Sequence, residues 1–129
     1  MAEETVARRH LYEALSVAVE IRAFITLLHV LPILAVMLAA EEDERHKLRA
    51  VEINALAYSH PFLANNQFFH DIAGREMAAL EAGLASEVVA AAKARGLELD
   101  FWPAAEILLE ELGRLGWGAD QNPSKLELA

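Results

Sequence analysis

The chain has 129 residues, the size of one domain, and 61 of them are Ala, Leu or Glu against 16 Val, Ile or Thr, which favours helices over strands. Its formal net charge of −9 comes from 20 acidic and 11 basic residues, and the cations do not cluster, so we expect no direct binding to nucleic acid. The absence of cysteine excludes disulfides and thiolate metal sites, and it fits the reducing cytoplasm.

The first predicted element is a helix from Thr5 to Ile21. Ala7, Leu11 and Ala14 recur there at four- and three-residue spacing, which places them on one helix face. The N-terminal segment MAEETVARRH is acidic and polar, whereas a secretory signal starts basic and continues apolar. We therefore expect a cytoplasmic protein without such a signal.

The second predicted element is the uncharged segment from Ala23 to Ala40. As a helix it would be roughly 27 Å long, the lower limit for crossing a membrane. His29 and Pro32 near its middle favour instead a helix buried between neighbouring helices, with His29 buried and bonded to a backbone carbonyl. We expect Pro32 to kink or break this helix, or the helix to begin near Leu31.

A third helix is predicted from an N-cap at Asp43 to Tyr58, because the residue before Pro61 is pushed out of the helical region. A fourth follows from a cap at Asn65 or Asn66 to about Gly83. Its apolar positions recur at helical spacing: Phe69, Ile72, Ala73, Met77, Leu80 and Leu84.

The last two predicted helices are short and carry start and stop signals. Ser86 is expected to cap the fifth, which should end with Gly96 in the left-handed C′ position. Asp100 is expected to cap the sixth, and Gly116 to end it. We expect residues 119–129 to be a flexible tail.

Three segments carry a resemblance to a known family: ARRHLYEAL (7–15), RAVEINALAYSHP (49–61) and AALEAGLASEVVAAAKARGLELDFWPAAEILLEEL (78–112). They resemble the C-terminal tetratricopeptide-repeat-like (TPR-like) region of bacterial LuxR-type transcriptional regulators and related signalling ATPases. The resemblance implies one all-α domain over residues 1–118, in which about six helices form antiparallel hairpins stacked as a right-handed α-solenoid.

The same resemblance implies a non-catalytic module that binds a protein or a small effector and holds no cofactor. The chain has no G-x-x-x-x-G-K-[ST] loop and no basic recognition helix, so neither ATPase activity nor DNA binding is expected. A homodimer through the apolar helix from Ala23 to Ala40 is a further expected interaction.

In such a module the ligand lies in a groove between hairpins, whose walls are formed by side chains outside the apolar seams. Phe68, together with Phe69 and Trp102, also fits a place in the core. The residues predicted for the walls are His10, Tyr12, Tyr58, Phe62, Phe68 and His70.

Two alternatives remain open on the sequence. His70-Asp71 within FFHDIAG looks like the doublet of HD-type metal-dependent phosphohydrolases, in which His46 and Asp100 would complete a divalent-metal site. Otherwise these are polar positions early in a helix, and we expect no metal site and no catalysis. The other alternative is a small membrane-anchored helical protein.

Overall fold

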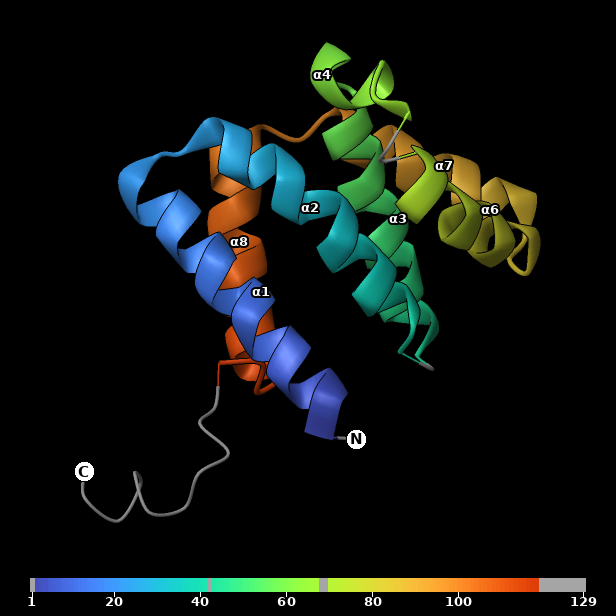
Figure 1. Ribbon diagram of the computed structural model, residues 1–129. Helices are drawn as coiled ribbons and strands as arrows, with labels where there is room; N and C mark the ends of the chain where they lie inside the picture. Colours follow the sequence, from blue (N-terminus) through green and yellow to red (C-terminus); the bar gives the residue numbers. More distant parts are fainter. Residues whose placement is uncertain (1, 42, 68–69, 119–129) are drawn as a thin grey trace.

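Seven α-helices and one π-helical turn make up the described part of the chain, residues 2–41, 43–67 and 70–118, in this computed structural model, and no strand occurs there (Figure 1). The predicted all-α class is confirmed. The tail at 119–129 and the aromatic pair Phe68 and Phe69 lie outside the described residues. The elements are α1 (Ala2–Ile21), α2 (Phe24–Ala39), α3 (Glu44–Tyr58), α4 (Pro61–Ala64), the π-helix η1 (His70–Gly74), α6 (Arg75–Ala82), α7 (Ser86–Leu97) and α8 (Phe101–Arg114).

Helix α2 lies at the centre of the molecule, with α1 on one side and α3 on the other (Figure 1). Helix α7 packs against α3, while α8 returns along the chain to pack against α1. In a solenoid each repeat touches its sequence neighbours, so the first and last helices lie apart. The contact between α1 and α8 means that a solenoid stack is not confirmed.

The face of α2 toward its neighbours is apolar and buried by the chain itself. The helix runs continuously through Pro32, so it neither breaks there nor begins near Leu31, and the alternative of a kink at Pro32 stays a prediction. Within the described residues no helix combines the length and hydropathy that a membrane crossing requires. The buried residues of α2 are Leu27, Leu28, Val30, Leu31, Pro32, Leu34, Ala35 and Leu38.

His29 of α2 departs from its predicted environment. Its Nδ1 atom lies 2.7 Å from the carbonyl oxygen of Ile25, as the predicted backbone contact requires. The side chain is exposed, however, because position 29 lies on the same exposed face of α2 as Ile25 and Ile33.

The start of α3 follows the sequence signals, and its end adds an element that they did not reveal. The Asp43 carboxylate accepts a hydrogen bond of 2.8 Å from the backbone N–H of Arg45, which confirms this residue as the N-cap. Helix α3 ends at Tyr58 as predicted. His60 then caps α4, a short helix missed in the sequence, by accepting a bond of 3.1 Å from the N–H of Phe62.

The predicted fourth helix is divided into the π-helical turn η1 and the α-helix α6, which ends at Gly83 as expected. A π-helix closes hydrogen bonds over five residues, and such turns are frequent at functional sites. Periodicity at 3.6 residues does not distinguish this turn from ordinary helix.

Two predictions for α7 are wrong. Ser86 is the first residue of the helix, its N-cap is Ala85, and no side chain bonds the free N–H groups there. Gly96 lies inside the helix rather than after it. A Cβ atom at Gly96 would lie 3.0 Å from the Cβ atom of Ala55 and closer still to the carbonyl oxygen of Glu52, so glycine here permits close packing of α7 on α3.

Helix α8 ends as predicted. Gly116 has a φ of 85°, the left-handed conformation that glycine adopts readily. The N–H of Trp117 bonds the carbonyl of Leu112 at 3.0 Å and that of Gly116 bonds Gly113 at 3.1 Å, the pattern of a Schellman motif. At the other end Asp100 occupies the N-cap position, but its side chain makes no capping bond.

The corner between α1 and α2 depends on Arg22, which has a φ of 55° and is the one non-glycine residue with a positive φ in the described chain. Its guanidinium donates a hydrogen bond of 2.7 Å to Glu106 on α8 and lies 5.0 Å above the ring of Trp102. Trp102 also packs against the core, beside Phe24, as predicted.

Candidate functional site

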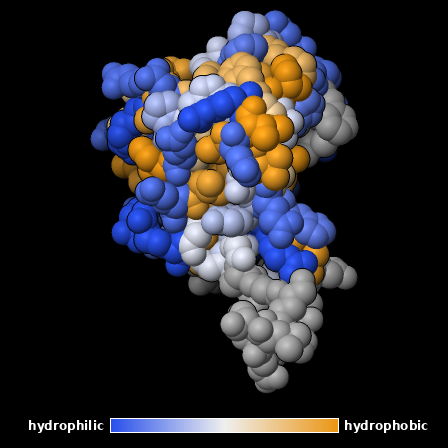
Figure 2. All heavy atoms as spheres, turned by 90° about the vertical axis from the view of Figure 1, so that its left-hand side faces the viewer, coloured by the Kyte–Doolittle hydropathy of each residue, from blue (hydrophilic) through white to orange (hydrophobic). Residues whose placement is uncertain are grey.

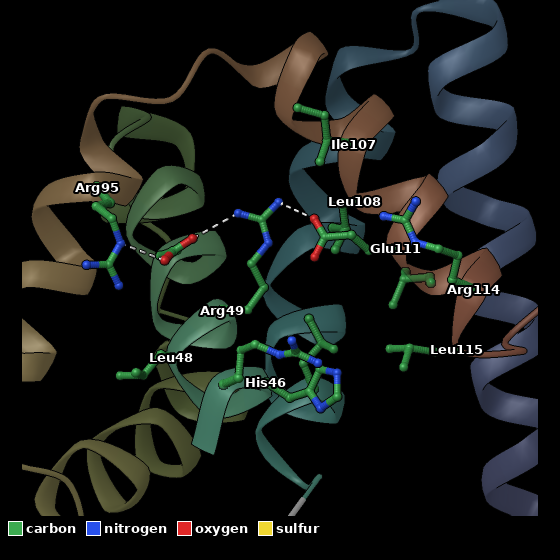
Figure 3. A pocket seen from close by; sticks show the side chains of 13 residues that line it. His46, Leu48, Arg49, Arg95, Ile107, Leu108, Glu111, Arg114 and Leu115 are labelled. Atoms are coloured by element: carbon green, nitrogen blue, oxygen red, sulfur yellow. Dashed lines mark hydrogen bonds and ion pairs between the residues drawn. The ribbon is translucent and has the colours of Figure 1, made fainter. Parts of the chain in front are cut away.

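A groove of about 540 Å³ lies between α3 and α8, and we call it the α3–α8 groove. Helix α2 contributes Leu38 to its lining, and α7 contributes Arg95 (Figure 3). The apolar lining residues are Leu38, Leu48, Ile107, Leu108, Leu112 and Leu115. The polar lining residues are Arg45, His46, Arg49, Glu52, Arg95, Glu111 and Arg114.

A chain of ion pairs crosses this groove from α7 to α8 (Figure 3). The Nε atom of Arg95 lies 2.8 Å from Glu52, which in turn accepts a bond of 2.9 Å from Arg49. The other amino group of Arg49 donates to Glu111 at 2.7 Å. Because the side chains of Arg49 and Glu52 are only 17% and 16% exposed, these bonds are partly protected from solvent.

Two arginines in the groove are not part of this chain of ion pairs. The guanidinium groups of Arg45 and Arg114 make no ion pair or hydrogen bond with the described residues. The Nδ1 atom of His46 is buried without a hydrogen bond, and its nearest carboxylate oxygen, on Asp43, is 3.7 Å away. The groove thus presents cationic donors that remain available to a ligand.

The charge of the groove is opposite to that of the chain. Four arginines and two glutamates give the lining a formal charge of +2, with His46 neutral, whereas the whole chain carries −9. The expectation that the cations do not cluster is therefore wrong. Arg45 and Arg49 are four residues apart on one helix face, which the sequence could have revealed, but Arg95 and Arg114 reach the groove only through the tertiary fold.

A second pocket of about 400 Å³ lies between α3, η1, α6 and α7, and we call it the α3–α6 pocket. It brings together Tyr58 and His70, whose ring centroids are 5.1 Å apart. The Tyr58 hydroxyl and the Oδ1 atom of Asn54 are buried there without hydrogen-bond partners, and burial raises the pKa of Tyr58 above its ordinary value of 10.0. At its edge Lys93 pairs with Glu81 at 2.8 Å.

The other predicted wall residues are dispersed. His10 is exposed on α1, and Tyr12 packs against Gly113 at the end of α8. Phe62 contacts the ring of His29 edge-on, with 5.4 Å between ring centroids, and Phe68 lies outside the described residues. Of the six predicted wall residues, Tyr58 and His70 line the same pocket.

The residues of the phosphohydrolase alternative are also separated. His46 lines the α3–α8 groove while His70 lines the α3–α6 pocket, where its Nε2 atom is 2.9 Å from the carbonyl oxygen of Ala64. Asp71 accepts a hydrogen bond from Gln67. Across residues 2–41, 43–67 and 70–118 no three His, Cys, Asp or Glu side chains are placed to hold a metal ion.

Comparison with known proteins gives no match: neither a scan of protein-family models nor searches of curated proteins and solved structures identify a relative of this chain. The functional argument therefore depends on the geometry of the two pockets and on the sequence patterns.

Proposed function

We propose that this chain is a non-catalytic binding module whose ligand lies in the α3–α8 groove. The observation that carries the proposal is that the guanidinium groups of Arg45 and Arg114 make no ion pair with the described residues, in a groove whose other arginines and glutamates are paired with one another. Ligand pockets are usually concave and combine apolar side chains with convergent polar groups, and this groove contains both.

The wider context of the module rests on the sequence resemblance alone. That resemblance supports a protein-binding or effector-binding region, with TPR-like helix hairpins, of a cytoplasmic bacterial transcriptional regulator or signalling ATPase. The groove is compatible with either kind of ligand, because arginine recognises the carboxylates of peptides and of small effectors alike.

The test is a screen of small carboxylates, small phosphates and acidic peptides by thermal unfolding, followed by amide chemical-shift mapping of each hit. We expect the largest shifts in α3 and α8, and a loss of binding in Arg45→Ala and Arg114→Ala. Arg75→Ala is the matched control, since Arg75 is exposed on α6 outside both pockets. Shifts confined to other helices, or a screen without hits, would contradict the proposal.

A further inference from the structure

The lining of the α3–α8 groove has two chemically distinct parts. Of its six aliphatic side chains, Leu48, Ile107 and Leu115 are partly or largely exposed, and an apolar body gains free energy by covering them. The two unpartnered arginines favour an anion, which would accept charge-assisted hydrogen bonds from them. A purely apolar ligand would leave the arginines unpaired, and a small inorganic anion would leave these three aliphatic side chains in contact with water.

We infer that the ligand is an amphiphilic anion, a molecule with a carboxylate or similar head and an aliphatic body. This inference rests on the proposed function, because it names the chemical class for the same groove. The head pairs with Arg45 and Arg114, and the body covers Leu48, Ile107 and Leu115. A groove of about 540 Å³ is within the range that holds ligands of this size.

Glu111 competes with such a ligand for the guanidinium group of Arg49. Its carboxylate lies in the groove and already occupies one amino group of Arg49 at 2.7 Å. An incoming carboxylate is repelled by Glu111, and it gains a third guanidinium when Glu111 is neutralised. Glu111 therefore keeps the affinity of the groove for anions below the value that its arginines alone would give.

Glu106 provides a matched control for Glu111. It lies on the same helix, and it accepts a bond of the same length, 2.7 Å, from an arginine, Arg22. It does not line the groove. Glu106→Gln and Glu111→Gln thus remove the same charge from the chain and differ in whether that charge faces the groove.

The experiment is calorimetric titration of the full chain with decanoate, decanol and acetate. We expect one decanoate to bind per chain, and decanol and acetate to bind at least about tenfold more weakly, because each loses one of the two parts of the interaction. Arg114→Ala and Arg45→Ala should each weaken decanoate binding by about tenfold or more. Glu111→Gln should strengthen it by roughly threefold or more, and Glu106→Gln should leave it unchanged.

Several outcomes overturn the inference, and they are distinct from a failure of the proposed function. Equal binding of decanol and decanoate would show that the head group is not recognised, while the groove would remain a binding site. Equal effects of Glu106→Gln and Glu111→Gln would assign the change to overall charge. Several decanoates per chain, unaffected by Arg114→Ala, would be detergent-like adsorption and would reject the class. The proposed function itself fails if the wider screen gives no hit, or if its hits map outside α3 and α8.

Discussion

Gly96 shows how a single hydrogen atom determines helix packing. In most helix interiors, replacing glycine by alanine is favourable by roughly 0.5–1 kcal/mol, because glycine loses more backbone entropy on folding. At position 96 the added methyl group would meet the α3 backbone at Glu52, and backbone atoms cannot rotate away.

We therefore expect Gly96→Ala to lower the free energy of unfolding by about 1–3 kcal/mol, since α7 must move away from α3. Urea unfolding followed by circular dichroism measures this value. Gly74→Ala is the control: the nearest side-chain atom to its added Cβ is 4.0 Å away, and φ is −60°. It should be neutral or slightly stabilising, and a similar loss at both positions would show that the close approach at Gly96 is not the cause.

The raised pKa of Tyr58 determines how the free energy of unfolding should depend on pH in alkaline solution. Burial raises its pKa in the folded state, so on titration above about pH 10 the unfolded chain releases this proton first. The folded state then holds more protons than the unfolded state, and the free energy of unfolding falls as pH rises toward the folded pKa. Well below pH 10 both states hold this proton, and the contribution is constant there.

Tyr58→Phe should remove this part of the alkaline loss, whereas Tyr12→Phe should retain it. The measurement is urea unfolding at a series of alkaline pH values for the two variants and the parent chain. Identical pH profiles for all three would contradict the assignment to Tyr58.

At the scale of elements, the ion pairs of Arg49 join α3 to α8 across the groove. Arg49→Met would leave Glu52 and Glu111, both less than one-third exposed, without this partner. We expect a loss of about 1–3 kcal/mol in urea unfolding. Arg45→Met, four residues earlier and without such a partner, should change stability by less than about 0.5 kcal/mol. Equal losses would mean that the bridge contributes nothing.

The same elements show what the sequence could predict. Local chemistry sufficed for the long helices and for the ends at Asp43 and Gly116, because capping depends on neighbouring residues in the chain, but it did not reveal α4 or η1. The prediction that Gly96 ends a helix is wrong, because glycine is required there by the close approach of α3, more than forty residues away in the chain. The arginines of the α3–α8 groove could not be grouped from the sequence for the same reason, because they come from three helices that only the fold brings together.

At the scale of the molecule, the first and last long helices stabilise each other. Tyr12 of α1 packs against Gly113 and Gly118, and Arg8 lies 5.5 Å above the ring of Trp117. Tyr12→Ala should therefore cost about 1–2 kcal/mol and accelerate amide hydrogen exchange in α8, about a hundred residues along the chain. His10→Ala, exposed on the same helix, is the control. Exchange that increases in α1 alone would indicate helices that open independently.

Self-association stays a prediction, and its surface is now smaller than the sequence suggested. Most of the apolar face of α2 is buried within the chain, and Ile25 remains 55% exposed. The face in Figure 2 shows apolar side chains in groups separated by hydrophilic ones. If α2 mediates a dimer, Ile25→Glu should shift sedimentation toward the monomer, whereas Leu97→Glu, at a 61% exposed site on α7, should not. A parent chain that is monomeric at every concentration would reject the dimer.

Arg22, at the corner between α1 and α2, has two structural roles. Its left-handed backbone is one that glycine adopts freely, while its guanidinium reaches Glu106 on the last helix. Arg22→Gly would keep the left-handed backbone conformation at this corner and remove the ion pair with Glu106. A single substitution at position 22 would therefore loosen the attachment of α8 and leave the corner between α1 and α2 unchanged.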